Sequence, residues 1–123
     1  MKGRPTVLIC DDDAALRSVI SHVAEDAGYE VVAEIDVATH LVEALASTKP
    51  DLITLDLWLP GMSGLDALRE IRAVSPNTRI VVFSAHDAWR EDALDLGADF
   101  FVEKPDFGVL AHVIHFATLA ASV

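Results

Sequence analysis

LITLDLWLPGMSG, the sequence of residues 52–64, joins an apolar run to a loop and to the start of a helix. The run 52–55 stops at Asp56, which is typical of a buried β-strand that reaches a polar surface. Pro60 and Gly61 mark a turn, and the pattern of residues 64–74 predicts a helix. The stretch therefore predicts a strand, a loop and a helix, with an aspartate at the carboxyl end of the strand.

The same order of strand and helix recurs along the chain. Apolar runs predict further strands at residues 6–10, 30–35, 79–83 and 100–102. Helical spacing predicts helices at 16–27, from 38 until Pro50 ends the helix, at 88–96 before Gly97, and from Asp106 onwards. Five strands alternating with five helices predict right-handed crossovers and an open parallel sheet with helices on both faces.

Length and composition favour one compact unit. A chain of 123 residues has the size of one domain, so we expect residues 1–123 to fold as a single domain. Its 52% hydrophobic and 24% charged residues exclude a disordered segment. The single cysteine, Cys10, cannot form an internal disulfide, and within an apolar strand it is expected to be a small buried side chain.

Net charge and hydropathy limit the classes of partner and the cell compartment that we expect for this protein. Twenty acidic against nine basic residues give a net charge of −11, which argues against direct nucleic-acid binding. No secretory leader opens the chain, and the stretch 107–123, which lacks Asp, Glu, Lys and Arg, is too short to span a membrane. We therefore expect a cytoplasmic protein.

Polar residues follow four of the predicted strands. They are Asp11, Asp12 and Asp13 after the first strand, Asp56 after the third, Ser84 after the fourth and Lys104 after the fifth. The carboxyl ends of parallel strands meet at one edge, where ligands bind in such sheets. Clustered carboxylates need a hard cation, and ligation by oxygen alone suits Mg²⁺. A hydroxyl and a lysine would share the charge of a phosphoryl group, so Asp56 occupies the place of a nucleophile.

In these residues the chain resembles the receiver domain of two-component response regulators. The resemblance rests on Asp11 and Asp12, on Asp-x-x-x-Pro-x-x-x-Gly at 56–64, on Ser84-Ala85 and on Lys104-Pro105. It spans the whole chain. It implies a flavodoxin-like, doubly wound (βα)5 fold whose five parallel strands follow the order 2-1-3-4-5.

The resemblance also implies a role for each residue. Asp56 would accept a phosphoryl group from a phosphohistidine of a sensor histidine kinase or a histidine phosphotransfer protein. The protein would catalyse this step and a slow autodephosphorylation itself. Mg²⁺ would be held by Asp12, Asp56 and the backbone carbonyl of Trp58, with Asp11 acting largely through water.

The remaining implied roles concern the phosphoryl oxygens and the switch. Lys104, followed by a cis Pro105, would pair with one oxygen, and Ser84 and the Ala85 amide would take the others. The Ser84 hydroxyl would move toward the phosphate and Phe101 would pack inward. This change would reach a partner through the face made by helix four, strand five and helix five.

Three features depart from the family pattern or extend it. The interval from Ser84 to Lys104 is shorter than the resemblance leads us to expect, so the helix-four region is predicted to be trimmed. Position 101 carries Phe in place of Tyr, which keeps the ring and removes a hydroxyl. Trp58 and His86 each stand two residues beyond a site residue, at the entrance, where we expect them to tune dephosphorylation. The indole would hinder the attacking water, whereas the histidine would either orient that water or face solvent, and we expect a slowed dephosphorylation.

The last helix is apolar around its whole circumference. One face cannot hide all of its large apolar side chains, so a homodimer or another partner on this helix is expected. These residues are Phe107, Val109, Leu110, Val113, Ile114, Phe116, Leu119 and Val123. The pair His112 and His115 has metal-ligand spacing but no neighbouring acidic or thiol ligand, and is interpreted as incidental.

Two other function classes compete with the signalling switch. Asp11-x-Asp13 approaches the nucleophile motif of haloacid-dehalogenase phosphatases, although Ala15 breaks it, and Asp13 alternatively caps the first helix. A receiver-like binding scaffold without phosphorylation is the second alternative. Whether such a switch would act alone, relay phosphoryl groups or belong to a longer protein stays open.

Overall fold

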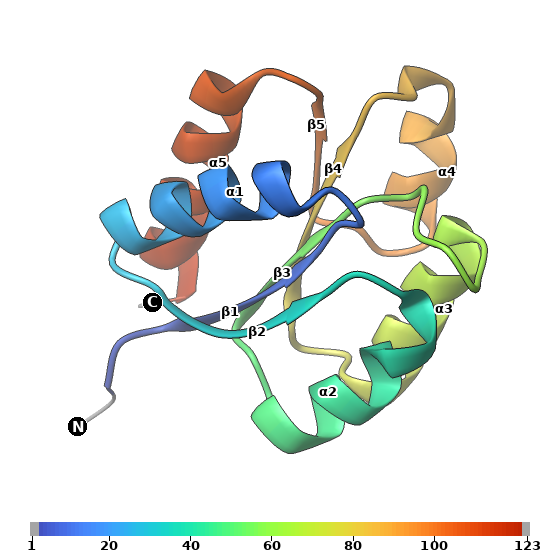
Figure 1. Ribbon diagram of the computed structural model, residues 1–123, viewed down its shortest axis with the longest axis horizontal. Helices are drawn as coiled ribbons and strands as arrows, with labels where there is room; N and C mark the ends of the chain where they lie inside the picture. The colour runs from blue at the N-terminus through green and yellow to red at the C-terminus, as the bar shows by residue number, and fades with distance from the viewer. Residues whose placement is uncertain (1–2, 122–123) are drawn as a thin grey trace.

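The computed structural model describes residues 3–121, with side chains up to residue 117, and contains a five-stranded parallel sheet (Figure 1). The strands follow the order β2-β1-β3-β4-β5. Their bounds are β1 Thr6–Cys10, β2 Glu30–Ile35, β3 Leu52–Leu55, β4 Arg79–Ser84 and β5 Phe100–Glu103. The helices are α1 Ala14–Asp26, α2 Leu41–Thr48, α3 Gly64–Val74, α4 Arg90–Asp95 and α5 Phe107–Ala121, with 3-10 turns η1 Ala38–His40 and η2 Asp87–Trp89. The flavodoxin-like fold and its strand order are as expected.

Helices cover both faces of the sheet. Figure 1 shows α1 beside α5 on one face, and α2, α3 and α4 on the other. Strand alternation feeds both layers: Val7 and Ile9 face the α1/α5 side, whereas Leu8 and Cys10 face the α2/α3/α4 side. β1 and β3 are buried on both faces, as continuous apolar runs predict.

Local sequence signals account for the start of α1 and the end of α4. The Asp13 carboxylate accepts hydrogen bonds from the amides of Ala15 and Leu16, which confirms it as the cap of α1. Gly97, which follows the C-cap residue Leu96 of α4, has φ of +111°, a conformation that side chains disfavour.

The α4 region is the clearest difference from the sequence prediction. A single helix was expected at 88–96, whereas η2 occupies Asp87–Trp89 and the α-helix has only six residues, Arg90–Asp95. Trp89 lies at the junction and packs partly into the α2/α3/α4 side of the core. Anchoring of this large side chain accounts for the tighter first turn.

The loop from β3 to α3 is closely packed at Gly64. A Cβ atom there would overlap the backbone carbonyl of Leu57, so only glycine fits. The amide of Ala38 donates to the Pro60 carbonyl at 2.9 Å and fastens the same loop to η1. The glycine of the 56–64 motif is therefore required by packing.

α5 buries one side and exposes apolar groups on another. Leu110, Ile114 and Ala117 are buried, whereas Val109 and Phe116 are 46% and 53% exposed. The side chain of Leu119 and all of Val123 lie outside the described residues. One face of α5 thus does not hide all its large apolar side chains, as expected.

Candidate functional site

Three carboxylates gather at the carboxyl edge of the sheet. Asp11 follows β1 and Asp56 follows β3, and these strands pair in register up to Cys10 and Leu55. The Asp56 amide donates to the Cys10 carbonyl at 2.9 Å, which extends the pairing to the site. One carboxylate oxygen each of Asp11, Asp12 and Asp56 lies within 4.8 Å of the other two. Asp11 and Asp56 are buried and Asp12 is exposed.

Lys104 brings a positive charge to two of these carboxylates. Its Nζ donates to Asp11 Oδ2 at 2.7 Å and to Asp56 Oδ2 at 3.3 Å. Burial by itself would lower the pKa of Lys104. The hydrogen bond to Asp11 and the attraction of both carboxylates outweigh burial and raise that pKa. Lys104 therefore stays an ammonium ion, and its bond to Pro105 is cis, as expected.

Asp56 sits where its charged form is disfavoured. Burial raises the pKa of its carboxyl group, and the nearby charge of Asp11 raises it further. The hydrogen bond from the Trp58 amide, 3.0 Å from Asp56 Oδ1, and the charge of Lys104 act in the opposite direction without cancelling the rise. Additional positive charge nearby would therefore stabilise the ionised form of Asp56.

The donor set fits a hard divalent cation. The ligand atoms on offer are carboxylate oxygens, and three negative charges face the single ammonium of Lys104. Oxygen ligands and uncompensated negative charge are what Mg²⁺ and Ca²⁺ sites have in common. Asp13 is not part of this set, because its carboxylate caps α1.

β4 contributes a hydroxyl to the same edge. Ser84 is fully buried at the end of β4, and its Oγ accepts from the His86 amide at 3.3 Å. The Ser84 carbonyl accepts from the Lys104 amide at 2.9 Å, which fixes β4 against the segment that carries the ammonium. Ala85 is exposed, in the segment that continues from Ser84.

Phe101 lies under the α4 region. It pairs with Val82 across the β4/β5 ladder and is 8% exposed. The Arg90 guanidinium lies over its ring, 4.8 Å from the centroid. The aromatic ring therefore packs inward in this structure.

Sequence reasoning placed Trp58 and His86 beside the site but did not identify the group that joins them. Trp58 is 54% exposed and stacks on Trp89, with ring centroids 5.3 Å apart and an interplanar angle of 15°. The His86 ring lies 4.8 Å from that of Trp58. The chain has only two tryptophans, and both follow neighbouring strands of the sheet. The position of Trp89 after the strand next to β3 was therefore the sequence signal that could have linked it to Trp58.

Arg17 is a second residue that the sequence pattern did not single out. Its Nη1 donates to the Asp11 carbonyl at 2.6 Å, and its Nε lies 3.3 Å from Glu34. It supports the backbone of Asp11 from the first turn of α1. Nothing in its spacing marks it as different from an ordinary surface arginine.

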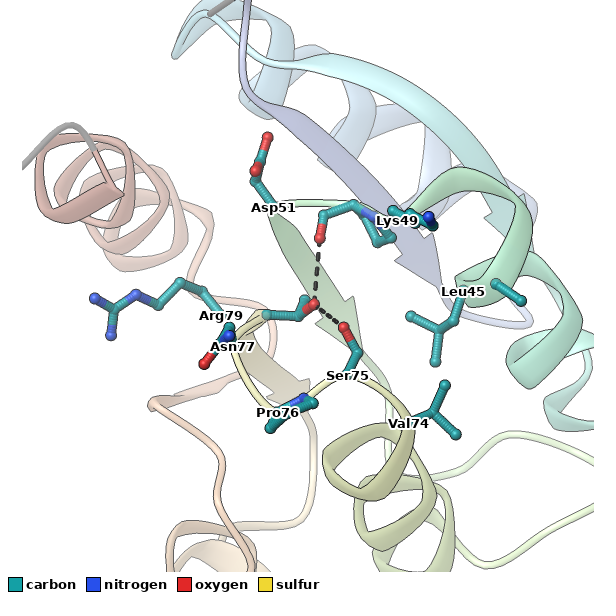
Figure 2. A pocket seen from close by; sticks show the side chains of 11 residues that line it. Leu45, Lys49, Asp51, Val74, Ser75, Pro76, Asn77 and Arg79 are labelled. Carbon is teal, nitrogen blue, oxygen red and sulfur yellow. Dashed lines mark hydrogen bonds between the residues drawn. The ribbon is translucent and has the colours of Figure 1, made fainter.

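A separate pocket of about 590 Å³ lies at the opposite edge of the sheet, before β3 and β4 (Figure 2). Leu45 and Val74 face it from α2 and α3. The Thr78 hydroxyl is hydrogen-bonded to that of Ser75 and donates to the Pro50 carbonyl at 3.3 Å. The strand-end carboxylates and Lys104 do not line this pocket.

Comparison with known sequences gives one consistent result. The response regulator receiver domain family matches residues 7–115. The chemotaxis protein CheY of Thermotoga maritima is 40% identical over 101 residues, which cover 80% of this chain and 84% of that protein. A protein-glutamate methylesterase/protein-glutamine glutaminase of Haloarcula marismortui is 38% identical over 102 residues, which cover 80% of this chain and 27% of the longer protein.

Solved structures agree with the fold. A two-component response regulator of the LuxR family from Aurantimonas sp. SI85-9A1 superimposes with a TM-score of 0.87 at 30% identity, covering 96% of this chain and 87% of the other. The response regulator domain of Thermotoga maritima CheB gives a TM-score of 0.82 at 28% identity, covering 94% and 97%. In the part of the chain that the structure describes, no helix is both long enough and apolar enough to cross a bilayer. Its fold, its strand-end residues and these matches together show that the chain belongs to the response regulator receiver domain family of two-component and chemotaxis signalling.

Proposed function

We propose that residues 1–123 act as one receiver unit in which Asp56 accepts a phosphoryl group from a phosphohistidine. The donor is a sensor histidine kinase or a histidine phosphotransfer protein. An Asp56 carboxylate oxygen attacks phosphorus, the bond between phosphorus and the imidazole nitrogen breaks, and the histidine leaves as neutral imidazole after taking up a proton. The observation that carries the proposal is the ammonium of Lys104, held 2.7 Å from Asp11 and 3.3 Å from Asp56.

Mg²⁺ is the proposed cofactor. Asp12 and Asp56, with the backbone carbonyl of Trp58, are the direct ligands in this proposal, and Asp11 acts largely through water. The grouping of three carboxylates within 4.8 Å supports it. Bound Mg²⁺ would neutralise charge that develops on the phosphoryl oxygens.

Three groups of the chain are proposed to hold the phosphoryl oxygens. The Lys104 ammonium, the Ser84 hydroxyl and the Ala85 amide are all donors. The Ser84 oxygen already accepts from the His86 amide, which leaves its own hydrogen free to donate to a phosphoryl oxygen. Ser84 and Lys104 thus orient and stabilise the group that Asp56 receives.

The same contacts are proposed to transmit the switch. Pairing of Ser84 with Glu103 and of Val82 with Phe101 joins the site to β5. A phosphoryl group that draws Ser84 toward it would shift the packing around Phe101 and Arg90. The face formed by α4, β5 and α5 would then change its affinity for a partner.

Intact mass spectrometry tests the chemistry. We expect a phosphoryl adduct after incubation with Mg²⁺ and acetyl phosphate, and none with Asp56→Asn or after chelation of the metal. Asp66→Asn is the matched control, because Asp66 is an exposed aspartate on α3 that pairs with Arg69. An adduct that persists in Asp56→Asn would refute the assignment of the acceptor.

The same samples separate the alternatives. Steady turnover of a small phosphomonoester such as p-nitrophenyl phosphate would favour the haloacid-dehalogenase class, which the capping role of Asp13 disfavours. No adduct from acetyl phosphate or from a phosphorylated histidine phosphotransfer domain, with metal binding retained, would favour a binding scaffold.

Trp58 and His86 are proposed to lengthen the life of the phosphoryl group. Trp58 exposes just over half of its surface and its amide donates to Asp56, so its indole is proposed to occupy space that an attacking water needs. Trp58→Asn is therefore expected to speed loss of the adduct, followed by intact mass against time. An unchanged decay rate would remove Trp58 from this role.

A second copy of the chain is the proposed partner of α5. Val109 and Phe116 are exposed, and α5 carries no Asp, Glu, Lys or Arg, so two copies can meet there without placing like charges of this helix against each other. Light scattering coupled to size exclusion should report a dimer that Phe116→Ser weakens. A strict monomer at micromolar concentration would contradict it.

A further inference from the structure

An aromatic cluster joins the two loops that carry the site residues of β3 and β4. We define the aromatic cluster as Trp58, His86 and Trp89. The Trp58 and Trp89 rings are stacked 5.3 Å apart, His86 lies 4.8 Å from Trp58, and His86 and Trp89 are 6.4 Å apart. Trp58 is two residues from Asp56, and His86 is two residues from Ser84. The cluster therefore bridges the acceptor and the hydroxyl.

The two loops differ in how firmly they are held. The β3–α3 loop is fixed by the close packing of Gly64 on Leu57 and by the hydrogen bond from Ala38 to Pro60. Residues 85–88, by contrast, are exposed throughout. Segments with few buried contacts open most easily. Aromatic contact thus helps to order the segment that follows Ser84, together with the hydrogen bond from the His86 amide to Ser84 and the ion pair of Asp87 with Arg90.

Within the cluster Trp89 is the anchored member. It is half-buried and packs against the core on the α2/α3/α4 side, whereas Trp58 is 54% exposed. The Trp89 amide also donates to the His86 carbonyl at 3.3 Å. Trp89 is therefore placed to hold Trp58 by stacking and His86 through its backbone.

We propose that Trp89 is a positioning residue that holds Trp58 and His86 at the entrance to Asp56 and thereby slows hydrolysis of the phosphorylated protein. This inference rests on the proposed function. Trp89 acts through Trp58, on which it stacks, while part of its own side chain packs against the core. Loss of the stack leaves Trp58 free to leave the entrance.

The step affected is attack by water. The water oxygen bonds to phosphorus, the bond between phosphorus and the Asp56 oxygen breaks, and the carboxylate and inorganic phosphate are released, with the water proton passing to phosphate or solvent. An indole held at the entrance reduces the space from which water approaches in line with the breaking bond. A Trp58 indole released from the stack reduces this space for only part of the time.

A double-mutant cycle tests this dependence. The variants are Trp89→Leu, Trp58→Leu and the double variant, since leucine keeps apolar contact but cannot stack. Decay of the phosphoryl adduct is followed by intact mass after the phosphodonor is removed. We expect Trp89→Leu to lose the adduct about two- to tenfold faster, the range that a stacked pair supplies. The double variant should be no faster than Trp58→Leu alone.

Two further variants separate positioning from general loosening. Trp89→Phe keeps an aromatic ring in the core and should restore most of the lifetime. Leu94→Ala is the matched control, because Leu94 is an exposed apolar residue of α4 outside the cluster, and its lifetime should equal that of the parent protein. If Trp89→Leu fails to fold, Trp89→Met replaces it, because methionine also keeps apolar contact without a ring that stacks on Trp58, and an unchanged lifetime in Trp89→Met would overturn the inference.

The outcomes also separate a failure of the role proposed for Trp89 from a failure of the proposed function. Effects of Trp58→Leu and Trp89→Leu that multiply in the double variant would show that Trp89 does not act through Trp58, and would overturn the inference while leaving the receiver chemistry intact. An unchanged lifetime in Trp89→Leu would do the same. Absence of any adduct in the parent protein would instead defeat the proposed function.

Discussion

Thr54 illustrates how one residue in the centre of the sheet can carry a cost. It lies on β3 and is 1% exposed, and among the side chains that the structure describes its hydroxyl is a buried group without a hydrogen-bond partner. A buried hydroxyl that loses its water without finding a partner costs about 1–3 kcal/mol. Its neighbours in the paired strands are the apolar Ile9 and Val81.

We therefore expect Thr54→Val to raise the free energy of unfolding by about 1 kcal/mol, because valine has the same shape without the hydroxyl. Urea denaturation followed by circular dichroism measures it. The matched control is Thr78→Val, whose hydroxyl bonds Ser75 and the Pro50 carbonyl and whose loss should destabilise the protein. Equal effects of the two substitutions would argue against the explanation.

At the scale of elements, Arg72 ties α3 to the loop between α4 and β5. Its guanidinium donates to the carbonyls of Gly97 and Thr78 and to the carboxylate of Asp99. Asp99 in turn accepts from the Ile80 amide at the start of β4. A short α4 is thus secured at its end by a side chain from the neighbouring helix.

Replacing Arg72 with Met should lower the free energy of unfolding by about 2 kcal/mol, since several carbonyls and the Asp99 carboxylate lose a charged donor. Arg69→Met on the same helix is the control. Arg69 pairs with Asp66 at the surface, where such a pair contributes about 0.2–1 kcal/mol. Chemical denaturation of both variants should show the difference, and equal losses would remove the special role of Arg72.

For the whole molecule, the excess of acidic residues makes stability depend on cations. The net charge is −11, and three carboxylates converge at one edge of the sheet. A ligand that binds only the folded state stabilises it, by about 1.4 kcal/mol at ten times its Kd. MgCl₂ should therefore raise Tm by roughly 4–6 °C more than NaCl of the same ionic strength.

Asp12→Asn is the informative variant for this prediction, because Asp12 is exposed and its substitution leaves the core intact. Without metal it should be at least as stable as the parent protein, since one repelling charge is gone. With MgCl₂ it should lose the extra increase in Tm. Differential scanning calorimetry measures both, and a retained increase would place the metal elsewhere.

Patterns that repeat along the chain were sufficient to predict the architecture. Strand ends marked by Asp11, Asp56, Ser84 and Lys104 are local signals, and the parallel sheet brings them to one edge without further information. The split of the α4 region into η2 and a six-residue α4 was not predictable in this way. It depends on Trp89 packing into a core formed by distant segments, a tertiary effect that spacing does not record.

The same distinction explains the candidate site. The chemistry of carboxylates and of a lysine is indicated by residue type alone, so these residues were found from the sequence. The Trp58–Trp89 stack and the support of Asp11 by Arg17 depend on relative orientation, which only coordinates supply. The roles assigned to Ser84, Ala85, Phe101 and His86 stay predictions.

The packing of Gly64 on the Leu57 backbone has a consequence for how this chain tolerates change. A library in which every position is randomised, sorted only for folded protein and never for signalling, should still reject each side chain at position 64. Residues 85–88, which are exposed, should accept most substitutions in the same sort. Of the two loops beside Asp56, the β3–α3 loop is therefore constrained by folding at Gly64, whereas the loop after β4 is free to diversify.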